Sequence, residues 1–250
     1  DELYRVFCDL VRIYRALDPP NLEKLTEVAV TFNPLQYAAR TIVQEGTILS
    51  SLYEADIDYE LYDPTVGGIK KRIVFYSGNQ WLDGPSQERL LEYVKSGGIL
   101  VAFRDFPRKD ENFRSLNRIG FHDPSRILFE FQKTFEIRLD SRTSTQITSS
   151  VYAFDEVRGE KITAHMPDFG PITIGYKKRL GKGVILHLGV EPSKDLLRAI
   201  LKYFPIPKHG NSPTRDVKTA LFKRGKKYYL IAVNNGMEDK SATIYFPAMK

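Results

Sequence analysis

The sequence predicts an α/β protein: a flavodoxin-like three-layer domain with a β-rich insertion, followed by part of a small β-sandwich. Short apolar strands alternate with helical patterns in the first half of the chain, as in parallel sheets covered by helices. Strand patterns then dominate from about residue 127 to residue 179. Three prolines and a glycine within residues 205–213 mark a boundary. We therefore expect a helix and linker at residues 1–20, the layered domain at 21–205 and the partial sandwich at 206–250.

The first residues of the chain have the spacing of an amphipathic helix. Its apolar positions are Leu3, Val6, Phe7, Leu10, Val11 and Tyr14. The pair Pro19-Pro20 ends the helix, because proline cannot continue it and restricts the residue before it. Since this apolar face needs a covering surface, we expect the chain to be a piece of a longer protein; a processed N-terminus is the alternative.

The next segment predicts the start of the sheet. Residues 28–32 are apolar and mostly β-branched, as in a strand buried on both faces, and Asn33-Pro34 ends them. A helix is expected to run through Ile42, Leu49, Leu52 and Tyr53. Residues 58–62 alternate polar and apolar side chains and predict an edge or half-exposed strand, which a turn at Asp63-Pro64 closes.

Residues 72–103 form the clearest unit of the sequence. A strand at 72–76 leads through a loop at 77–84 into a helix from Pro85, and a second strand follows at 99–103. Pro85 suits the first turn of a helix, and Gly97-Gly98 suits its end. A strand, helix and strand of this length imply a parallel pair with a right-handed crossover.

The remaining elements are weaker. A short helix is expected at 113–119, strands at 127–131, 151–154, 172–176 and 184–188, and a closing helix at 192–204. Beyond the boundary, residues 218–222 and 228–233 predict a hairpin, and residues 242–246 one further strand. Three strands are too few for an independent sandwich, so either the rest lies beyond Lys250 or the hairpin docks on the first domain.

Composition and charge exclude several classes of protein. The chain carries 37 Lys and Arg against 31 Asp and Glu, a formal charge of +6, and its basic clusters lie at turns and strand starts. That pattern indicates a solvated surface, so we expect no nucleic-acid partner. No apolar run of about 18 residues occurs, so we expect no membrane partner and assign the protein to the cytoplasm. The single cysteine, Cys8, excludes an internal disulfide and a cysteine-based zinc cluster.

The sequence offers no nucleophile for covalent catalysis, since no cysteine follows a strand and no Gly-x-Ser-x-Gly pentapeptide occurs. Residues 176–183 are rich in lysine and glycine but lack the spacing and the following helix of a phosphate loop, so they predict a basic turn. The four histidines lie far apart, and His187 alternates with core residues, which predicts a buried, hydrogen-bonded side chain. We therefore expect no catalytic residue, no metal and no cofactor.

The loops after the strands are the expected contact site, because ligands and partners of an open α/β sheet meet the carboxyl ends of its strands. From these loops we select Asn79, Trp81, Arg104 and Asp105 as residues that contact a ligand or partner. Trp81 is the only tryptophan, and an exposed indole suits a sugar or partner contact. Packing of Trp81 on Leu82 and Tyr93 is the equal alternative.

Several ordered segments resemble a known domain. They are the strand and loop at 72–83, the helix at 87–94, the glycine pair and strand at 97–103, the run 106–111, and the closing segments 174–178 and 181–189. Together they resemble the glutamine-amidotransferase-like domain of β-galactosidases from glycoside hydrolase families 42 and 35, over about residues 25–205. The C-terminal piece resembles the sandwich that follows in those chains.

The resemblance implies a function for the chain. In those enzymes the catalytic carboxylates lie in an N-terminal (β/α)8 barrel, whereas this domain has lost the amidotransferase nucleophile, supports oligomerisation and helps to frame the active site. The implied function is therefore a non-catalytic accessory region of a glycoside hydrolase that cleaves terminal β-galactosides. Its implied partners are further copies of itself, a catalytic barrel and carbohydrate. A free-standing carbohydrate-binding module and an unrecognised small-molecule enzyme on an α/β fold are the alternatives.

Overall fold

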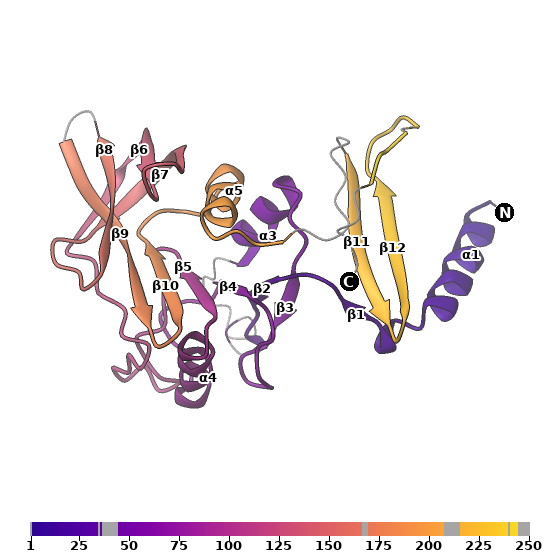
Figure 1. Ribbon diagram of the computed structural model, residues 1–250, viewed down its shortest axis with the longest axis horizontal. Helices are drawn as coiled ribbons and strands as arrows, with labels where there is room; N and C mark the ends of the chain where they lie inside the picture. The colour runs from indigo at the N-terminus through magenta and orange to yellow at the C-terminus, as the bar shows by residue number, and fades with distance from the viewer. Residues whose placement is uncertain are drawn as a thin grey trace. The chain divides into compact units, whose positions relative to one another are not determined.

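The computed structural model describes residues 2–34, 36, 45–166, 170–207, 216–239 and 241–244. The chain divides into two compact units, a large unit of Glu27–Pro207 and a small unit that combines Asp1–Thr26 with Lys208–Lys250. Figure 1 shows the elements of each unit. The protein is of the mixed α/β class that the sequence predicts, with one large mixed sheet and few helices in the described residues.

The large unit is built on a mixed sheet that has nine strands in the described part of the chain. One half is parallel and consists of β2 (Val28–Thr31), β3 (Glu60–Tyr62), β4 (Ile73–Tyr76), β5 (Ile99–Ala102) and β10 (Gly183–Leu188). Numbered in chain order, these parallel strands lie side by side in the order 2-1-3-4-5. An antiparallel half continues from β10 through β9 (Gly170–Leu180), β8 (Glu160–Met166), β6 (Arg126–Arg138) and β7 (Ser144–Ala153).

Helices cover both faces of the parallel half (Figure 1). On one face lie α3 (Glu45–Glu54) and α5 (Lys194–Tyr203), and on the other lies α4 (Gly84–Lys95). The side chains of β4 alternate accordingly, since Ile73 and Phe75 join the core below α3 and α5 while Val74 and Tyr76 join the core below α4. All four are buried, which is why this strand is a continuous apolar run in the sequence.

The predicted strand–helix–strand unit is confirmed, because β4 and β5 are parallel neighbours joined by α4. Asp83 caps the helix, since its carboxylate accepts a hydrogen bond from the Ser86 amide at 2.9 Å. The helix is followed by Gly97, whose φ of 124° suits glycine. The strands predicted at 28–32, 58–62 and 184–188 and the helix predicted at 192–204 are also found, as β2, β3, β10 and α5. The helix expected through Ile42 is found as α3 from residue 45, and Ile42 itself lies outside the described residues.

The short helix predicted at residues 113–119 is wrong. Residues 110–114 form a tight loop, in which the Asp110 carboxylate accepts hydrogen bonds from the amides of Asn112 and Arg114 at 2.9 and 2.8 Å. A carboxylate that binds these amides competes with helical hydrogen bonding and favours a turn. In this loop Phe113 has a left-handed φ of 60°.

The expected β-rich segment is found between β5 and β10 in the sequence, and its strands extend the main sheet beyond β10. Its strands β6, β7 and β9 are longer than predicted, and the sequence pattern does not predict β8. In β8 only Ile162, Ala164 and Met166 face the core, and polar, exposed residues alternate with them. Three inward residues, one of them alanine, give a weak apolar signal.

The small unit contains α1 (Glu2–Leu17), the short 3-10 helix η1 (Pro19–Asn21), β1 (Glu23–Lys24), β11 (Val217–Arg224) and β12 (Lys227–Asn234). The predicted N-terminal helix and the predicted hairpin of β11 and β12 are confirmed, and β1 completes an antiparallel sheet of order β1-β11-β12. The further strand predicted at 242–246 is absent at residues 241–244, and residues 245–246 lie outside the described part. None of the described helices is long and apolar enough to span a membrane.

Candidate functional site

The residues selected from the sequence lie at one edge of the large sheet. Because β2, β4, β5 and β10 are parallel neighbours, their carboxyl ends lie along the same edge. Asn79 and Trp81 follow β4, and Arg104 and Asp105 follow β5. The topology thus brings all four to this edge, where each pair has its own set of partners.

The Asn79 side chain stabilises the loop to which it belongs. Its side-chain oxygen accepts hydrogen bonds from the Trp81 amide at 3.0 Å and from the Gln36 side chain at 3.2 Å. The same Gln36 amide group also donates to the Trp81 carbonyl oxygen, and Gln36 is buried. The Asn79 amide is therefore part of a buried network, which fixes the shape of the loop after β4.

The expectation of an exposed Trp81 is wrong, since only 9% of this residue is exposed. The loop after β5 explains its burial, because Lys109 in that loop forms a backbone bridge with Trp81. The ring of Phe113 from the same loop lies 6.0 Å from the Trp81 ring, and Phe113 is 62% exposed. Phe113 is therefore the exposed aromatic residue here, and contact of Trp81 with a ligand or partner stays a prediction.

The Arg104 side chain contacts one residue of β7 and one residue that follows β10. Its guanidinium forms an ion pair with Glu191, which follows β10, and donates to the Tyr152 hydroxyl of β7 at 3.3 Å. The guanidinium carbon also lies 4.6 Å from the centre of the Tyr152 ring. A cation held by an acid on one side and a ring on the other is already oriented, so it is suited to rigid contact with a ligand or partner.

Asp105 is partly exposed and lies near Tyr76, the last residue of β4. Burial raises the pKa of the Tyr76 hydroxyl above its usual range; a hydrogen bond with Gln36 opposes this rise, and the charge of Asp105 adds to it. The hydroxyl therefore stays protonated at neutral pH and donates to the Asn79 carbonyl oxygen at 2.7 Å. Tyr76 supports the loop after β4 and is not positioned as an acid or base.

His187 of β10 is buried and hydrogen-bonded, as predicted. Its Nε2 lies 3.1 Å from the Phe103 carbonyl oxygen, and its Nδ1 lies 3.2 Å from the Tyr176 hydroxyl. Because a carbonyl oxygen only accepts, we place the proton on Nε2, and Nδ1 then accepts from Tyr176. Burial lowers the pKa of His187 to about 3, so the ring is neutral at physiological pH. His187 is a structural residue of the core.

The described part of this edge offers contact groups but shows no catalytic pair. Ser77, the first residue after β4, is buried, and its hydroxyl donates to the Thr31 carbonyl oxygen. Its amide donates to the Thr31 hydroxyl at 2.9 Å, so Ser77 joins the ends of β2 and β4. Among the described residues, no group of three or more His, Cys, Asp or Glu could hold a metal ion.

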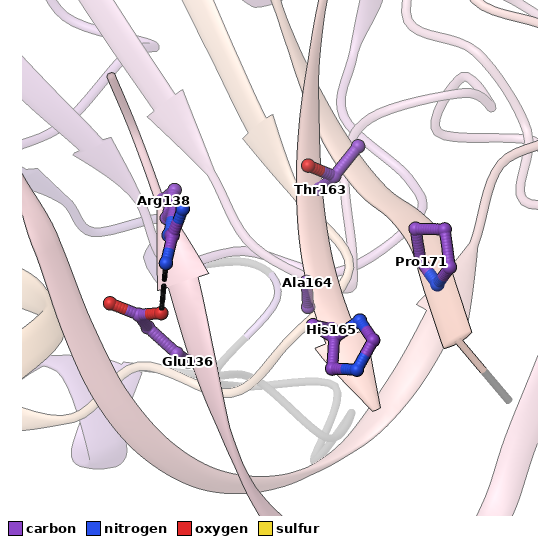
Figure 2. Close-up of a pocket in the computed structure, with 6 residues that line it drawn as sticks. All are labelled: Glu136, Arg138, Thr163, Ala164, His165 and Pro171. Atoms are coloured by element: carbon purple, nitrogen blue, oxygen red, sulfur yellow. Dashed lines mark hydrogen bonds and ion pairs between the residues drawn. The ribbon is translucent and has the colours of Figure 1, made fainter. Parts of the chain in front are cut away.

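A separate hollow of about 270 Å³ lies on the antiparallel half of the sheet (Figure 2). It is lined by Glu136, Arg138, Thr163, Ala164, His165 and Pro171, which come from β6, β8 and β9. Of these residues only His165 belongs to a set considered from the sequence, the four histidines that lie far apart in the chain. The alternation of exposed and buried residues in β8 places Thr163 and His165 on one face. The register that brings them beside Glu136 and Arg138 cannot be read from the sequence.

Comparison with known proteins shows a family match for part of the chain and a fold match for most of it. Residues 29–120 match a family model described as GLMA-like, second domain. The fold is similar to the β-galactosidase from Rahnella sp. R3, with 14% identity and a TM-score of 0.68 over 94% of this chain and 40% of that chain. A catalytic mutant of a GH42 β-galactosidase from G. stearothermophilus is 13% identical and has a TM-score of 0.60, over 84% of this chain and 34% of that chain. Alpha-L-fucosidase isoenzyme 2 from Paenibacillus thiaminolyticus is 11% identical and has a TM-score of 0.60, over 92% of this chain and 41% of that chain.

The resemblance stated from the sequence is confirmed by these matches. The chain resembles a GLMA-like second domain in sequence and GH42 β-galactosidases in fold. No curated protein matches the chain. The chain spans about two-fifths of the length of the Rahnella enzyme and about a third of the G. stearothermophilus enzyme, at 40% and 34%.

Proposed function

We propose that the chain is a non-catalytic accessory region of a glycoside hydrolase of the β-galactosidase type. The observation that carries the proposal is the fold match, which includes 94% of this chain but only 40% of a β-galactosidase chain. The family model adds that a domain of this kind stands second in its proteins. We propose that the catalytic carboxylates lie in another domain of the enzyme.

The chemistry of the sheet edge supports an accessory role. A glycosidase needs two carboxyl groups held on opposite sides of the scissile bond. At the edge, Glu191 is paired with Arg104, and the loop after β4 is tied down through Asn79 and Tyr76. These groups are rigid and internally bonded, which suits a surface that frames a neighbouring site or supports oligomerisation.

The exposed side chains of helix α1 are evidence that a partner domain or partner chain covers it. Three residues of its apolar face, Val6, Phe7 and Tyr14, are exposed large apolar side chains. An apolar helix face of this kind is normally buried against another element. We propose that a catalytic domain of the same protein or a further copy of the chain covers it.

The finer assignment of the fold belongs to the same proposal. The parallel strand order 2-1-3-4-5 is the flavodoxin-like order, which supports the amidotransferase-like assignment of the large unit. The sheet of β1, β11 and β12 is too small to stand alone, which supports its assignment as part of a β-sandwich. The single cysteine fits the reducing cytoplasm, where we place the protein.

The substrate of the whole enzyme is proposed on narrower grounds. The structural neighbours include β-galactosidases and also an α-L-fucosidase, so this fold accompanies hydrolases of different sugars. We propose terminal β-galactosides as the substrate, because the GH42 enzymes are β-galactosidases and match this fold. The sugar specificity itself would reside in the catalytic domain.

Immunodepletion tests the proposal. An antibody raised against the chain is used to deplete an extract of the source cells, and hydrolysis of nitrophenyl β-galactoside is measured before and after. We expect the antibody to remove the activity, and we expect the purified chain alone to hydrolyse nothing above a mock preparation. Turnover by the purified chain would contradict the non-catalytic role. Activity that stays entirely in the depleted extract would contradict the link to a β-galactosidase.

A further inference from the structure

We propose that the hollow between β6, β8 and β9 binds a single neutral sugar ring. This site lies on the antiparallel half of the sheet, away from the strand ends that the accessory role uses. The proposal therefore does not depend on that role. It rests on the residues that line the hollow, on their charges and on the polar groups that have no protein partner.

Strand register places the lining side chains on one face. Glu136 of β6 stands opposite His165 of β8, which stands opposite Pro171 of β9. Directly opposed residues of antiparallel strands point to the same face, so these three form one row across the sheet. Arg138 stands opposite Thr163 and forms a second row on that face. Figure 2 shows both rows lining the hollow.

On the opposite face of these strands, the described residues next to the hollow are apolar and buried. Ile137 and Ala164, which separate the members of the two rows, are buried in the main core. The backbone beneath the hollow is therefore held by the core. The hollow is a feature of a rigid sheet, and its side chains project from fixed positions.

The charges in the hollow cancel. The Glu136 carboxylate accepts hydrogen bonds from Arg138 Nε and Nη2 at 3.1 and 3.0 Å. Hydrogen bonds from Ser144 and Arg138 lower the pKa of Glu136 below its usual range, so the carboxylate is ionised at neutral pH. A ligand anion would meet this carboxylate, and a ligand cation would meet the guanidinium. The pair therefore favours a neutral ligand.

Several polar groups in the hollow have no hydrogen-bond partner among the described residues. They are Nη1 of Arg138, the hydroxyl of Thr163 and the ring nitrogens of His165. Arg138 offers a donor, Thr163 offers a donor and an acceptor, and His165 offers two ring nitrogens that can form hydrogen bonds. Donors and acceptors at neighbouring positions match the adjacent hydroxyl groups of a sugar. The ring of Pro171 adds a flat apolar surface for the C–H face of the sugar.

The size of the hollow limits the ligand to one ring. Its volume of about 270 Å³ lies just below the range of about 300–1,000 Å³ that is typical of ligand pockets. The lining is also open to water, with 70% of the Arg138 side chain and 39% of the Glu136 side chain exposed. Hydrogen bonds made in contact with water contribute little net affinity, so we expect a Kd in the range of roughly 1–10 mM.

A titration followed by amide NMR tests the site directly. The 15N-labelled chain is titrated with methyl β-galactoside up to about 100 mM, well above the expected Kd, and with glycerol as a control for unspecific effects. We expect saturable shifts at residues 136–138 and 163–165 with the sugar, and none with glycerol. Saturation transfer from the protein to the ring protons of the sugar is expected in the same samples.

Variants assign the binding to the side chains. R138Q and T163V each remove donor groups from an exposed strand position, and we expect R138Q to raise the Kd about threefold, as the loss of one water-exposed hydrogen bond would. R126Q is the matched control, because Arg126 lies on the same strand and forms a comparable exposed ion pair with Asp155 at 3.0 Å. R126Q should leave the Kd unchanged. The amide spectrum of each variant reports whether it is folded.

Three results would overturn the proposal. The first is the absence of saturable shifts up to the highest sugar concentration. The second is a set of shifts centred on another surface, such as the loops that contain Trp81 and Phe113. The third is an equal Kd for R138Q and R126Q in folded proteins, which would show that Arg138 in the hollow does not take part in binding.

Discussion

Replacing His187 with glutamine is expected to reduce the acid sensitivity of the large unit. The imidazole is wholly buried, and the rings of Phe106, Phe121 and Phe154 surround it with centroids 4.6 to 5.1 Å away. Burial lowers the pKa of His187 from 6.5 to about 3. Protonation of this ring is therefore much easier in the unfolded chain than in the folded protein.

The sign and size of the effect follow from proton linkage. As pH falls below 6.5 the unfolded state binds a proton that the folded state does not bind, so the free energy of unfolding decreases. With one pKa unit equal to about 1.4 kcal/mol, this residue alone lowers the free energy of unfolding by about 2 kcal/mol between pH 7 and pH 5. The loss continues until about pH 3, where the folded protein also becomes protonated. Glutamine has no such proton to bind.

Urea unfolding at pH 7 and at pH 5 measures this difference. Trp81 is the only tryptophan and is buried in the large unit, so its fluorescence reports unfolding of that unit. H187Q is expected to be less stable than the wild type at pH 7, because the glutamine replaces a packed ring. Between pH 7 and pH 5, however, the wild type should lose about 2 kcal/mol more than H187Q. Equal losses in the two proteins would refute the reasoning, since all other titrating groups are shared.

Three further changes have defined outcomes. R104Q should lower the free energy of unfolding by about 1–2 kcal/mol, because it removes the Glu191 ion pair and the Tyr152 contacts. R126Q removes an exposed ion pair and should lower the free energy of unfolding by less than about 0.5 kcal/mol. Equal losses for R104Q and R126Q in urea unfolding would contradict a stabilising role of the Arg104 contacts. G183A should cost about 3 kcal/mol or prevent folding, because a Cβ there would lie 2.1 and 2.3 Å from two backbone carbonyl oxygens. G67A, with no atom within 4 Å of the added Cβ, should leave the free energy of unfolding unchanged, and urea unfolding of the two variants measures the difference. The exposed face of α1 should bind an apolar fluorescent dye, and F7S should reduce that fluorescence; an unchanged signal would place the apolar surface elsewhere.

Local signals predict the parallel half of the sheet well. A strand buried on both faces is an apolar run, and the run at β4 is followed by a capped helix and a glycine that ends it. These signals depend on neighbouring residues alone, so no distant contact overrides them. The buried role of His187 was predictable for the same reason, because it alternates with core residues of one strand.

Distant contacts decide the features that the sequence did not predict. Trp81 is buried because a loop some thirty residues later forms a bridge to it, and that loop was expected to contain a helix. The missing helix in that loop is an exception with a local cause, because the Asp110 carboxylate accepts hydrogen bonds from two amides of its own loop. The hollow depends on the register of β6 against β8, which joins Glu136 to His165. Register follows from the packing of whole strands, so side-chain types at isolated positions do not reveal it.

The mass of the natural polypeptide tests the central claim most directly. An antibody against the chain is used to detect the protein in a denaturing gel of source cells. An accessory region of a glycoside hydrolase should appear in a polypeptide several hundred residues longer than the 250 residues of this chain. A single band near 28.7 kDa, the mass of the chain itself, would contradict the claim. The carbohydrate-binding module or an independent enzyme would then be the better account.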